Sequence, residues 1–171
     1  LQVRSKLEEL AEGFNGRQRV RLLVDREGEI TLQHSELAVM STLLPVRLRL
    51  AASPVDSKDT FLYHKTTNRS IYETARGQVL DCDDVVLFNQ EGFVTETTID
   101  NIVVQNADGT VVTPPVSSGL LAGTYRAYLL DQGRIAEEAV TIDQLKSATS
   151  IAVINSVRGW RPAVLLPQTP D

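Results

Sequence analysis

Phe61-Leu-Tyr-His-Lys-Thr-Thr-Asn-Arg69 is the stretch that joins two different patterns of this sequence. Before it, Arg47-Leu-Arg-Leu-Ala-Ala52 alternates as a β-strand does, and after it Ile71–Ala75 begin a helical pattern. Lys65 therefore lies at a junction, beside the apolar residues that open the stretch. A lysine at the edge of an apolar wall is expected to have a lowered pKa, because desolvation disfavours its charged form, and its amine can then form a Schiff base. Taken alone the pattern indicates little, since most lysines are solvated surface charges.

The totals exclude several classes of protein. The chain has 171 residues, is 42% hydrophobic and 23% charged, and carries a net charge of −5, so nucleic acid and anionic membrane are not its expected partners. Its single cysteine, Cys82, excludes an internal disulfide and a cysteine-based metal cluster. The two histidines, His34 and His64, show no metal-ligand spacing, so we expect no metal site. There is no signal-peptide pattern and no stretch of membrane-spanning length, which predicts a cytoplasmic enzyme.

The first part of the chain predicts a small set of elements. Ser5–Phe14 reads as a helix, and Arg19–Val24 and Glu29–Gln33 read as strands joined by a hairpin loop that ends in Gly28. One helix and one hairpin cannot bury a core. We therefore expect residues 1–43 to be the tail of a smaller α+β domain whose beginning is missing, followed by a linker over Ser41–Pro45.

The remainder, residues 44–171, predicts a second domain that is rich in strands. Expected strands are 46–52, a meander of 84–88, 93–97, 101–105 and 110–113, then 137–141, 151–154 and 159–166. One expected helix ends near Arg76, and two further helices cover 123–132 and 142–148. This order predicts an α+β or barrel-like fold.

Three polar segments outside the Lys65 stretch are candidate binding groups. Glu96 lies in the alternating strand Phe93–Thr97, where a carboxylate commonly faces solvent. Gly119-Leu-Leu-Ala-Gly-Thr-Tyr-Arg126 opens a helix with two glycines; the N–H groups at such an end bind phosphate, although the same pattern serves simple capping. Asn155-Ser-Val-Arg-Gly-Trp160 leaves a buried strand and enters a loop, a common place for binding groups.

This sequence resembles the class IV (fold-type IV) aminotransferases, which bind pyridoxal phosphate (PLP). The resemblance lies in three features that follow one another in this order: Lys65, Gly92-Phe-Val-Thr-Glu-Thr-Thr-Ile-Asp-Asn-Ile102 and the glycine-opened helix. His64–Arg69 and Asn155–Trp160 look most like the aminodeoxychorismate lyases of that family, including those fused to aminobenzoate synthase. The resemblance runs from about Pro45 to Ala163. It implies that residues 44–171 form a strand-rich, barrel-like PLP-binding domain.

The resemblance also implies residue roles. Lys65 would hold the cofactor and then act as general base and acid. Glu96, followed five residues on by Asn101, would keep the pyridine nitrogen protonated, and Asn101 would brace the turn or the glutamate. The phosphate would be bound by Gly123, Thr124 and Tyr125 through the backbone, and by Ser156, which Asn155 flanks. Many relatives carry a threonine where this chain has Tyr125, so no hydroxyl contact is expected there.

The activity implied by the resemblance is that of a PLP-dependent aminodeoxychorismate lyase, which forms 4-aminobenzoate and pyruvate in folate biosynthesis. A class IV transaminase of branched-chain or D-amino acids is the alternative, and a non-catalytic remnant domain is a second. Branched-chain transaminases carry a tyrosine near the place of Asn68-Arg69, and its absence favours the lyase. The resemblance implies a small-molecule substrate and a homodimer. Arg158 and Arg161 either meet substrate carboxylates or lie in a solvated loop.

Overall fold

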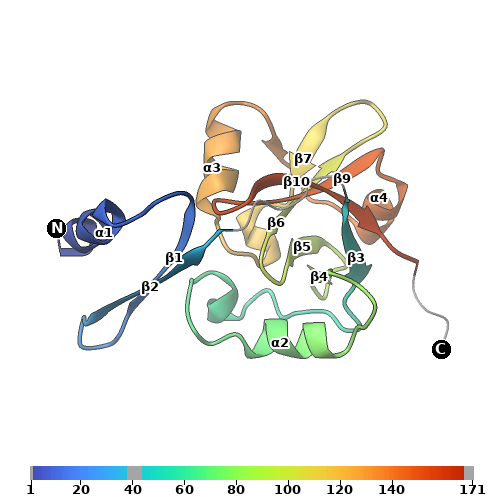
Figure 1. Cartoon of the computed structure of the whole chain (residues 1–171). Coiled ribbons are helices and arrows are strands. Elements are labelled where there is room, and N and C mark those ends of the chain that lie inside the picture. Colours follow the sequence, from blue (N-terminus) through green and yellow to red (C-terminus); the bar gives the residue numbers. More distant parts are fainter. Residues whose placement is uncertain (1, 38–43, 168–171) are drawn as a thin grey trace. The chain divides into compact units, whose positions relative to one another are not determined.

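The computed structural model describes residues 2–37 and 44–167 and divides the chain into two compact units, Leu1–Ser41 and Thr42–Asp171 (Figure 1). The predicted linker at 41–43 lies outside the described residues, and only Leu44 and Pro45 of that region are described. That the first unit belongs to a larger domain remains a prediction.

The first unit contains one helix and one hairpin, as the sequence predicts. Helix α1 is Gln2–Glu12, and β1 (Gln18–Val24) pairs antiparallel with β2 (Ile30–Glu36). The turn between the strands is stabilised by the Asp25 carboxylate, which accepts hydrogen bonds from the backbone N–H groups of Glu27 and Glu29 at 3.0 and 2.8 Å. No described residue of α1, β1 or β2 is buried, so this unit has no core of its own.

The second unit consists of strands with helices between them. Its strands are β3 (Val46–Leu50), β4 (Asp84–Phe88), β5 (Val94–Thr97), β6 (Asn101–Gln105), β7 (Val111–Thr113), β8 (Ala136–Glu137), β9 (Ser150–Asn155) and β10 (Gly159–Leu165). Its helices are α2 (Ser70–Gly77), α3 (Thr124–Asp131) and α4 (Ile142–Ser147), with 3₁₀ turns η1 (Thr60–Leu62) and η2 (Val116–Ser118). None of the helices that the structure describes is long and apolar enough to cross a membrane.

The main sheet of this unit closes on itself. Its strand order is β5-β4-β3-β10-β9-β6-β7-β8, and β5 also pairs with β6 through Glu96 and Asn101. The strands β5, β4, β3, β10, β9 and β6 therefore form a closed barrel, in agreement with the predicted fold class. The meander from β4 to β7 is confirmed as consecutive antiparallel pairs. The closure itself depends on β10, which pairs with β9 on one side and runs parallel to β3 on the other.

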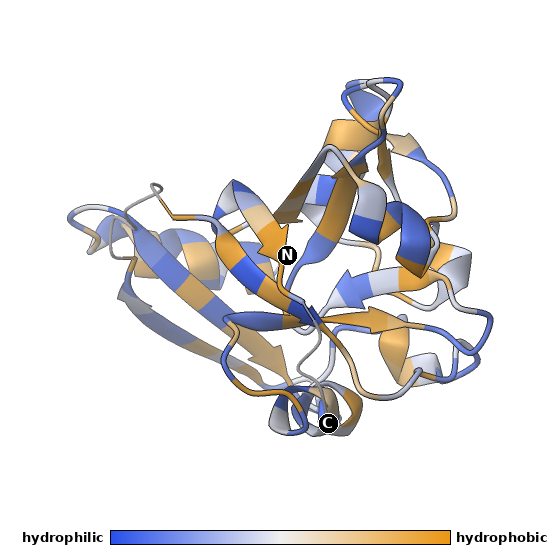
Figure 2. Ribbon diagram, turned by 90° about the vertical axis from the view of Figure 1, so that its right-hand side faces the viewer, coloured by the Kyte–Doolittle hydropathy of each residue, from blue (hydrophilic) through white to orange (hydrophobic). Residues whose placement is uncertain are grey.

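Successive side chains along a strand point alternately into the barrel interior and into the layer between the barrel and the helices. In β4, Val86 belongs to the interior cluster, whereas Val85 and Leu87 pack in the cluster that includes Tyr72 and Ala75 of α2. In β6 and β9 the other outward residues pack with Leu129 of α3: Val103, Ala152 and Ile154. Hydrophobic residues gather in the strands of this unit in Figure 2. Because both strand faces are covered, these strands read as apolar runs in the sequence.

One predicted strand is wrong in extent. The segment 137–141 was expected to be a strand, but β8 covers only Ala136–Glu137. The following residues run beside the start of β5 through single contacts, such as the hydrogen bond from Val94 N–H to the Val140 carbonyl at 2.8 Å. Thr141 then caps α4, so the chain turns into a helix before a longer ladder can form.

Candidate functional site

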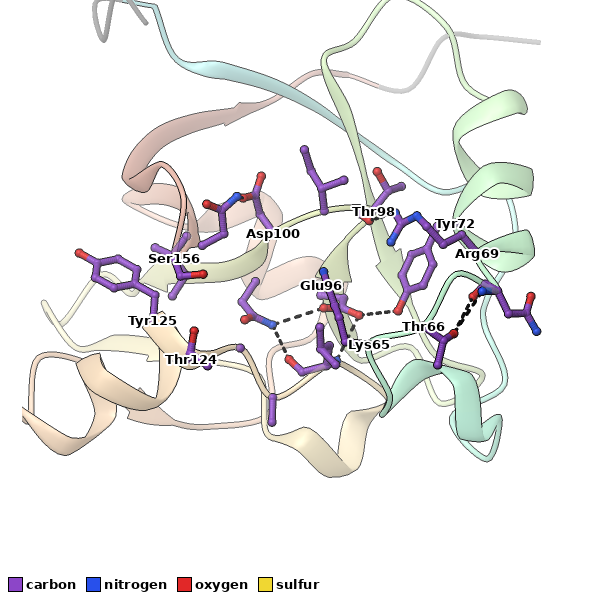
Figure 3. Close-up of a pocket in the computed structure, with 18 residues that line it drawn as sticks. Lys65, Thr66, Arg69, Tyr72, Glu96, Thr98, Asp100, Thr124, Tyr125 and Ser156 are labelled. Atoms are coloured by element: carbon purple, nitrogen blue, oxygen red, sulfur yellow. Dashed lines mark hydrogen bonds between the residues drawn. The ribbon is translucent and has the colours of Figure 1, made fainter. Parts of the chain in front are cut away.

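A pocket of about 330 Å³ opens in the second unit, where several elements meet. All seven residues predicted as site residues line it: Lys65, Glu96, Gly123, Thr124, Tyr125, Asn155 and Ser156. They come from the loop before α2, from β5, from the start of α3 and from the end of β9 (Figure 3). The barrel brings these segments together because Asn101 of β6 pairs with Glu96 of β5 on one side and with Ile154 of β9 on the other.

Glu96 is buried at the inner end of the pocket and is surrounded by donors. Only 5% of the residue is exposed. One carboxylate oxygen accepts hydrogen bonds from the Tyr72 hydroxyl at 2.8 Å and the Leu121 N–H at 3.2 Å, and the other accepts from the Asn101 amide at 3.3 Å. Burial raises the pKa of Glu96 to about 7, although the Tyr72 and Leu121 bonds and the charge of Lys65 oppose that rise. The carboxyl group therefore titrates near neutral pH.

Tyr72 was not singled out from the sequence, because an aromatic residue on a helix face reads as core. It is 8% exposed, and burial, followed by the charge of Glu96, raises the pKa of its hydroxyl. The Arg69 guanidinium lies 4.8 Å from the centre of its ring and donates to the Thr98 carbonyl at 2.6 Å. Arg69 is the N-cap of α2 and Tyr72 lies in its first turn, but the bond from Tyr72 to Glu96, 24 residues on, is not visible in the local sequence pattern.

Lys65 lies on the loop between η1 and α2, in an exposed position. Figure 3 shows its side chain reaching over Glu96. The desolvated setting expected from the apolar residues before it is wrong: Leu62 packs into the core, but the chain then turns outward, and residues 64–68 are all exposed. What the structure provides for this amine is a nearby carboxylate and free space.

The start of α3 forms the opposite end of the pocket. Gly123 is the N-cap and provides no side-chain bond to the first turn, so the N–H groups of that turn remain available to a ligand. A Cβ atom at this position would lie 2.2 Å from the Asn101 side-chain oxygen, so the close approach requires glycine. The Asn101 amide also donates to the Leu121 carbonyl at 2.9 Å, which ties this loop to Glu96. The prediction that Asn101 braces the turn or the glutamate is thus confirmed for the glutamate, to which the same amide donates at 3.3 Å.

A second turn faces the same end. The Asn155 side-chain oxygen accepts hydrogen bonds from the backbone N–H groups of Val157 and Arg158 at 2.9 and 2.7 Å, and Ser156 is exposed at the tip. The sequence predicts that Arg161 either contacts a substrate carboxylate or lies in a solvated loop, and the structure agrees with neither prediction. Its side chain is 12% exposed and pairs with Asp100 at 2.5 Å. Arg158 is exposed.

This arrangement favours a particular kind of ligand. A buried carboxylate stands at one end with the Lys65 side chain over it, and N–H groups and a serine hydroxyl stand at the other end. Such a site suits a flat, protonated heterocycle that carries an anionic group. Over residues 2–37 and 44–167, no group of three His, Cys, Asp or Glu side chains could hold a metal ion.

Comparison with known proteins gives concordant matches. The sequence model described as amino-transferase class IV matches residues 1–166. The chain is 34% identical over 158 residues to a Schizosaccharomyces pombe protein named "Putative aminodeoxychorismate lyase", covering 88% of this chain and 68% of that protein. It is 28% identical over 130 residues to a Saccharomyces cerevisiae aminodeoxychorismate lyase, covering 64% of this chain and 34% of the yeast protein.

Among solved structures, a Mesorhizobium loti protein described as a putative amino-acid aminotransferase superposes with a TM-score of 0.90 at 37% identity, covering 96% of this chain and 80% of that one. A Legionella pneumophila protein described as a putative 4-amino-4-deoxychorismate lyase gives a TM-score of 0.73 at 26% identity, covering 81% and 53%. The chain thus spans between 34% and 80% of the lengths of these four proteins.

Proposed function

This chain belongs to the class IV aminotransferase family, and from that premise we propose that it is the PLP-binding part of an enzyme acting on an amino-acid-like substrate. The activity we propose is that of a 4-amino-4-deoxychorismate lyase, which releases 4-aminobenzoate, a folate precursor, and pyruvate. The names of the two yeast relatives support this choice. The observation that carries the proposal is that Lys65 and Glu96 line one pocket whose far end presents the start of α3 and Ser156.

The residues fit the cofactor. Glu96 would contact the pyridine nitrogen, and a positive charge there would lower the pKa of this carboxyl from about 7, so that both groups stay charged at neutral pH. The N–H groups of Thr124 and Tyr125 and the Ser156 hydroxyl would bind the phosphate, with Gly123 leaving room for the close approach. Figure 3 shows the Tyr125 ring directed away from Glu96, which leaves only its backbone for this role.

The chain's own residues would then divide the chemistry. PLP, when bound, supplies an electron sink for charge that develops at the substrate α-carbon. Glu96 would strengthen that sink by holding the ring nitrogen protonated. Lys65 would hold the cofactor through its amine and, once released, would take and return the proton at the α-carbon. Its exposed position gives the amine room to move between these two tasks.

The second candidate is an amino-acid transaminase, favoured by the likeness to the Mesorhizobium loti protein. The two activities differ in their need for an amino acceptor. A transaminase requires an α-keto acid, whereas a lyase releases 4-aminobenzoate without one. Product release from aminodeoxychorismate, with and without an added keto acid, distinguishes them.

Two further properties are proposed from the resemblance: a homodimer and a cytoplasmic location. The exposed position of Lys65 supports the first, because a partner subunit over the pocket would exclude water from the amine. Light scattering of the purified protein tests it, and a monomer with a full complement of cofactor would contradict it.

The decisive experiment compares Lys65→Ala with Lys58→Ala, since Lys58 is also an exposed loop lysine but does not line the pocket. We expect the wild-type protein and K58A to develop a visible absorption band with PLP and to retain the cofactor after borohydride reduction, on the peptide that contains Lys65. We expect K65A to show neither. Retention on another lysine, or no band in the wild-type protein, would overturn the proposal and leave a non-catalytic domain as the better interpretation.

A further inference from the structure

Asp100 lies at the wall of the pocket and is almost completely buried. The residue is 2% exposed, and its two carboxylate oxygens have different partners. One accepts a hydrogen bond from the Asn155 side-chain amide, and the other pairs with the Arg161 guanidinium. Sequence reasoning gave it no role, because a lone aspartate in a turn between strands reads as a turn residue.

The backbone around Asp100 is fixed. Asp100 belongs to the turn between β5 and β6, where its carbonyl accepts hydrogen bonds from the Thr97 N–H at 2.8 Å and the Thr97 hydroxyl at 3.1 Å. The Asp100 N–H in turn donates to the same hydroxyl at 3.0 Å. The carboxylate is thus a rigid anchor beside the barrel end.

Asn155 transmits that anchor to the turn that carries Ser156. Its amide nitrogen donates to Asp100, while its oxygen accepts from the backbone N–H groups of Val157 and Arg158. The nitrogen of the Asn155 side chain is thus held by Asp100, and its oxygen holds the turn. Because the bond to Asp100 fixes which end of the amide is the donor, it also fixes the oxygen that holds the turn.

Charge explains the presence of Arg161. A carboxylate close to the expected phosphate would repel a dianion. The ion pair with Arg161, a side chain only 12% exposed, offsets the charge of Asp100 without placing a free cation in the pocket. Asp100 can then support an anion-binding turn at little electrostatic cost.

We propose that Asp100 is a positioning residue which, through Asn155, holds the 155–158 turn in the shape that binds the phosphate group of the ligand. The inference rests on the proposed function, since it concerns one end of the same ligand. It predicts an effect that depends on phosphate: loss of the anchor weakens ligands that carry the group and leaves its phosphate-free analogue unaffected.

The test compares Asp100→Asn with Asp83→Asn. Asp83 also pairs with an arginine, Arg47, at 2.9 Å, but in an exposed position outside the pocket. Dissociation constants for PLP and for pyridoxal, which lacks the phosphate, are measured by absorption. We expect D100N to bind PLP at least about tenfold more weakly, which is the lower end of the loss seen when the hydrogen-bond partner of a metal ligand is removed. We expect its affinity for pyridoxal to change less than about twofold, and D83N to match the wild type.

Equal weakening of PLP and pyridoxal in D100N, or no weakening of either, would overturn the proposal, because a general structural role affects both ligands alike. If D100N does not fold, the double variant Asp100→Ala/Arg161→Gln replaces it, since that variant leaves neither an acceptor for the Asn155 amide at residue 100 nor an unpaired buried charge. Its expected ligand profile is the same.

Titration with inorganic phosphate separates this inference from the proposed function. In the wild-type protein we expect phosphate to shift the backbone amide resonances of Thr124 and Ser156, and in D100N we expect at least about tenfold more phosphate to be needed. If these shifts occur but borohydride traps no cofactor on Lys65, the proposed function is wrong and the anchor role stands. If phosphate shifts neither resonance in the wild type, the anchor role is wrong.

Discussion

At the scale of single residues, Glu96 combines deep burial with hydrogen bonds from three directions, and these features act on its pKa in opposite senses. Desolvation favours the neutral acid, whereas donors favour the carboxylate. The Tyr72 hydroxyl gives the shortest of the three bonds, at 2.8 Å. Tyr72 is therefore the residue whose removal should reveal the balance most clearly.

We expect Tyr72→Phe to raise the pKa of Glu96 above its value of about 7, by about one unit, because a hydrogen bond to a charged group contributes about 1.5 kcal/mol or more. The measurement is a ¹³C NMR titration of the side-chain carboxyl in the cofactor-free protein. Tyr63→Phe is the matched control, since the Tyr63 hydroxyl donates instead to the Ser57 carbonyl. A Glu96 pKa that is the same in Y72F and Y63F would show that the hydroxyl does not stabilise the carboxylate.

The site could be predicted from the sequence only in part. Motifs in a recognisable order predict Lys65, Glu96 and the two segments proposed to bind phosphate, and residues of all of them line one pocket. Tyr72 and Asp100 could not be predicted, because their significance depends on partners that are distant in the sequence. The exposure of Lys65 was also wrongly expected, since apolar neighbours in the sequence do not show in which direction the chain turns.

At the scale of elements, the start of α3 depends on one glycine. The Asn101 side chain occupies the space where a Cβ atom of residue 123 would lie. The same Asn101 contacts Glu96 and the Leu121 carbonyl, so a displacement at this point reaches both ends of the pocket.

We expect Gly123→Ala to destabilise the protein by about 1–3 kcal/mol, as is usual when a group is forced into a filled space, and to weaken PLP binding. Chemical denaturation and cofactor titration measure the two effects. Gly77→Ala is the control, because a Cβ atom at this α2 position has no neighbour within 4 Å; it should be neutral or stabilising by up to about 1 kcal/mol. Equal stability of G123A and G77A would contradict the close contact with Asn101.

The elements themselves were predictable where local patterns determine them. Alternation and apolar runs predict β4, β6 and β9, and glycine-containing turns predict the meander. The closure of the barrel was not predictable from local patterns. It requires the parallel pairing of β10 with β3, for example of Ala163 with Val46. These residues are far apart along the chain, and no turn motif in the sequence indicates that they pair.

At the scale of the whole molecule, Glu96 makes stability depend on pH. Its folded pKa of about 7 lies above the value of 4.5 for the free side chain, so the folded protein binds this proton more tightly than the unfolded chain does. The resulting contribution to stability is fully present below about pH 4.5 and is lost as the pH rises through about 7. The loss amounts to roughly 3 kcal/mol.

We expect Glu96→Gln to remove this dependence, because an amide does not titrate. The measurement is the free energy of unfolding of the cofactor-free protein between pH 4.5 and 8, for wild type and E96Q. Asp100, with a raised pKa, and Asp83, with a lowered one, contribute to both curves, so the difference between the curves isolates Glu96. A difference that stays constant across this range would contradict the raised pKa.

The parallel pairing of β10 with β3 has a consequence for the order in which the second unit folds. Ribosomal synthesis proceeds from the N-terminus, so Lys65 and Glu96 emerge well before the strand that closes the barrel. Pairings between strands that are far apart along the chain are slow to form, because the entropy of closing the intervening loop is lost before any contact is gained. The 155–158 turn lies just before that last strand, so the end of the pocket that we propose to bind phosphate should be completed late in folding. A ligand that reaches the nascent chain would then act on a nearly finished barrel rather than guide its assembly.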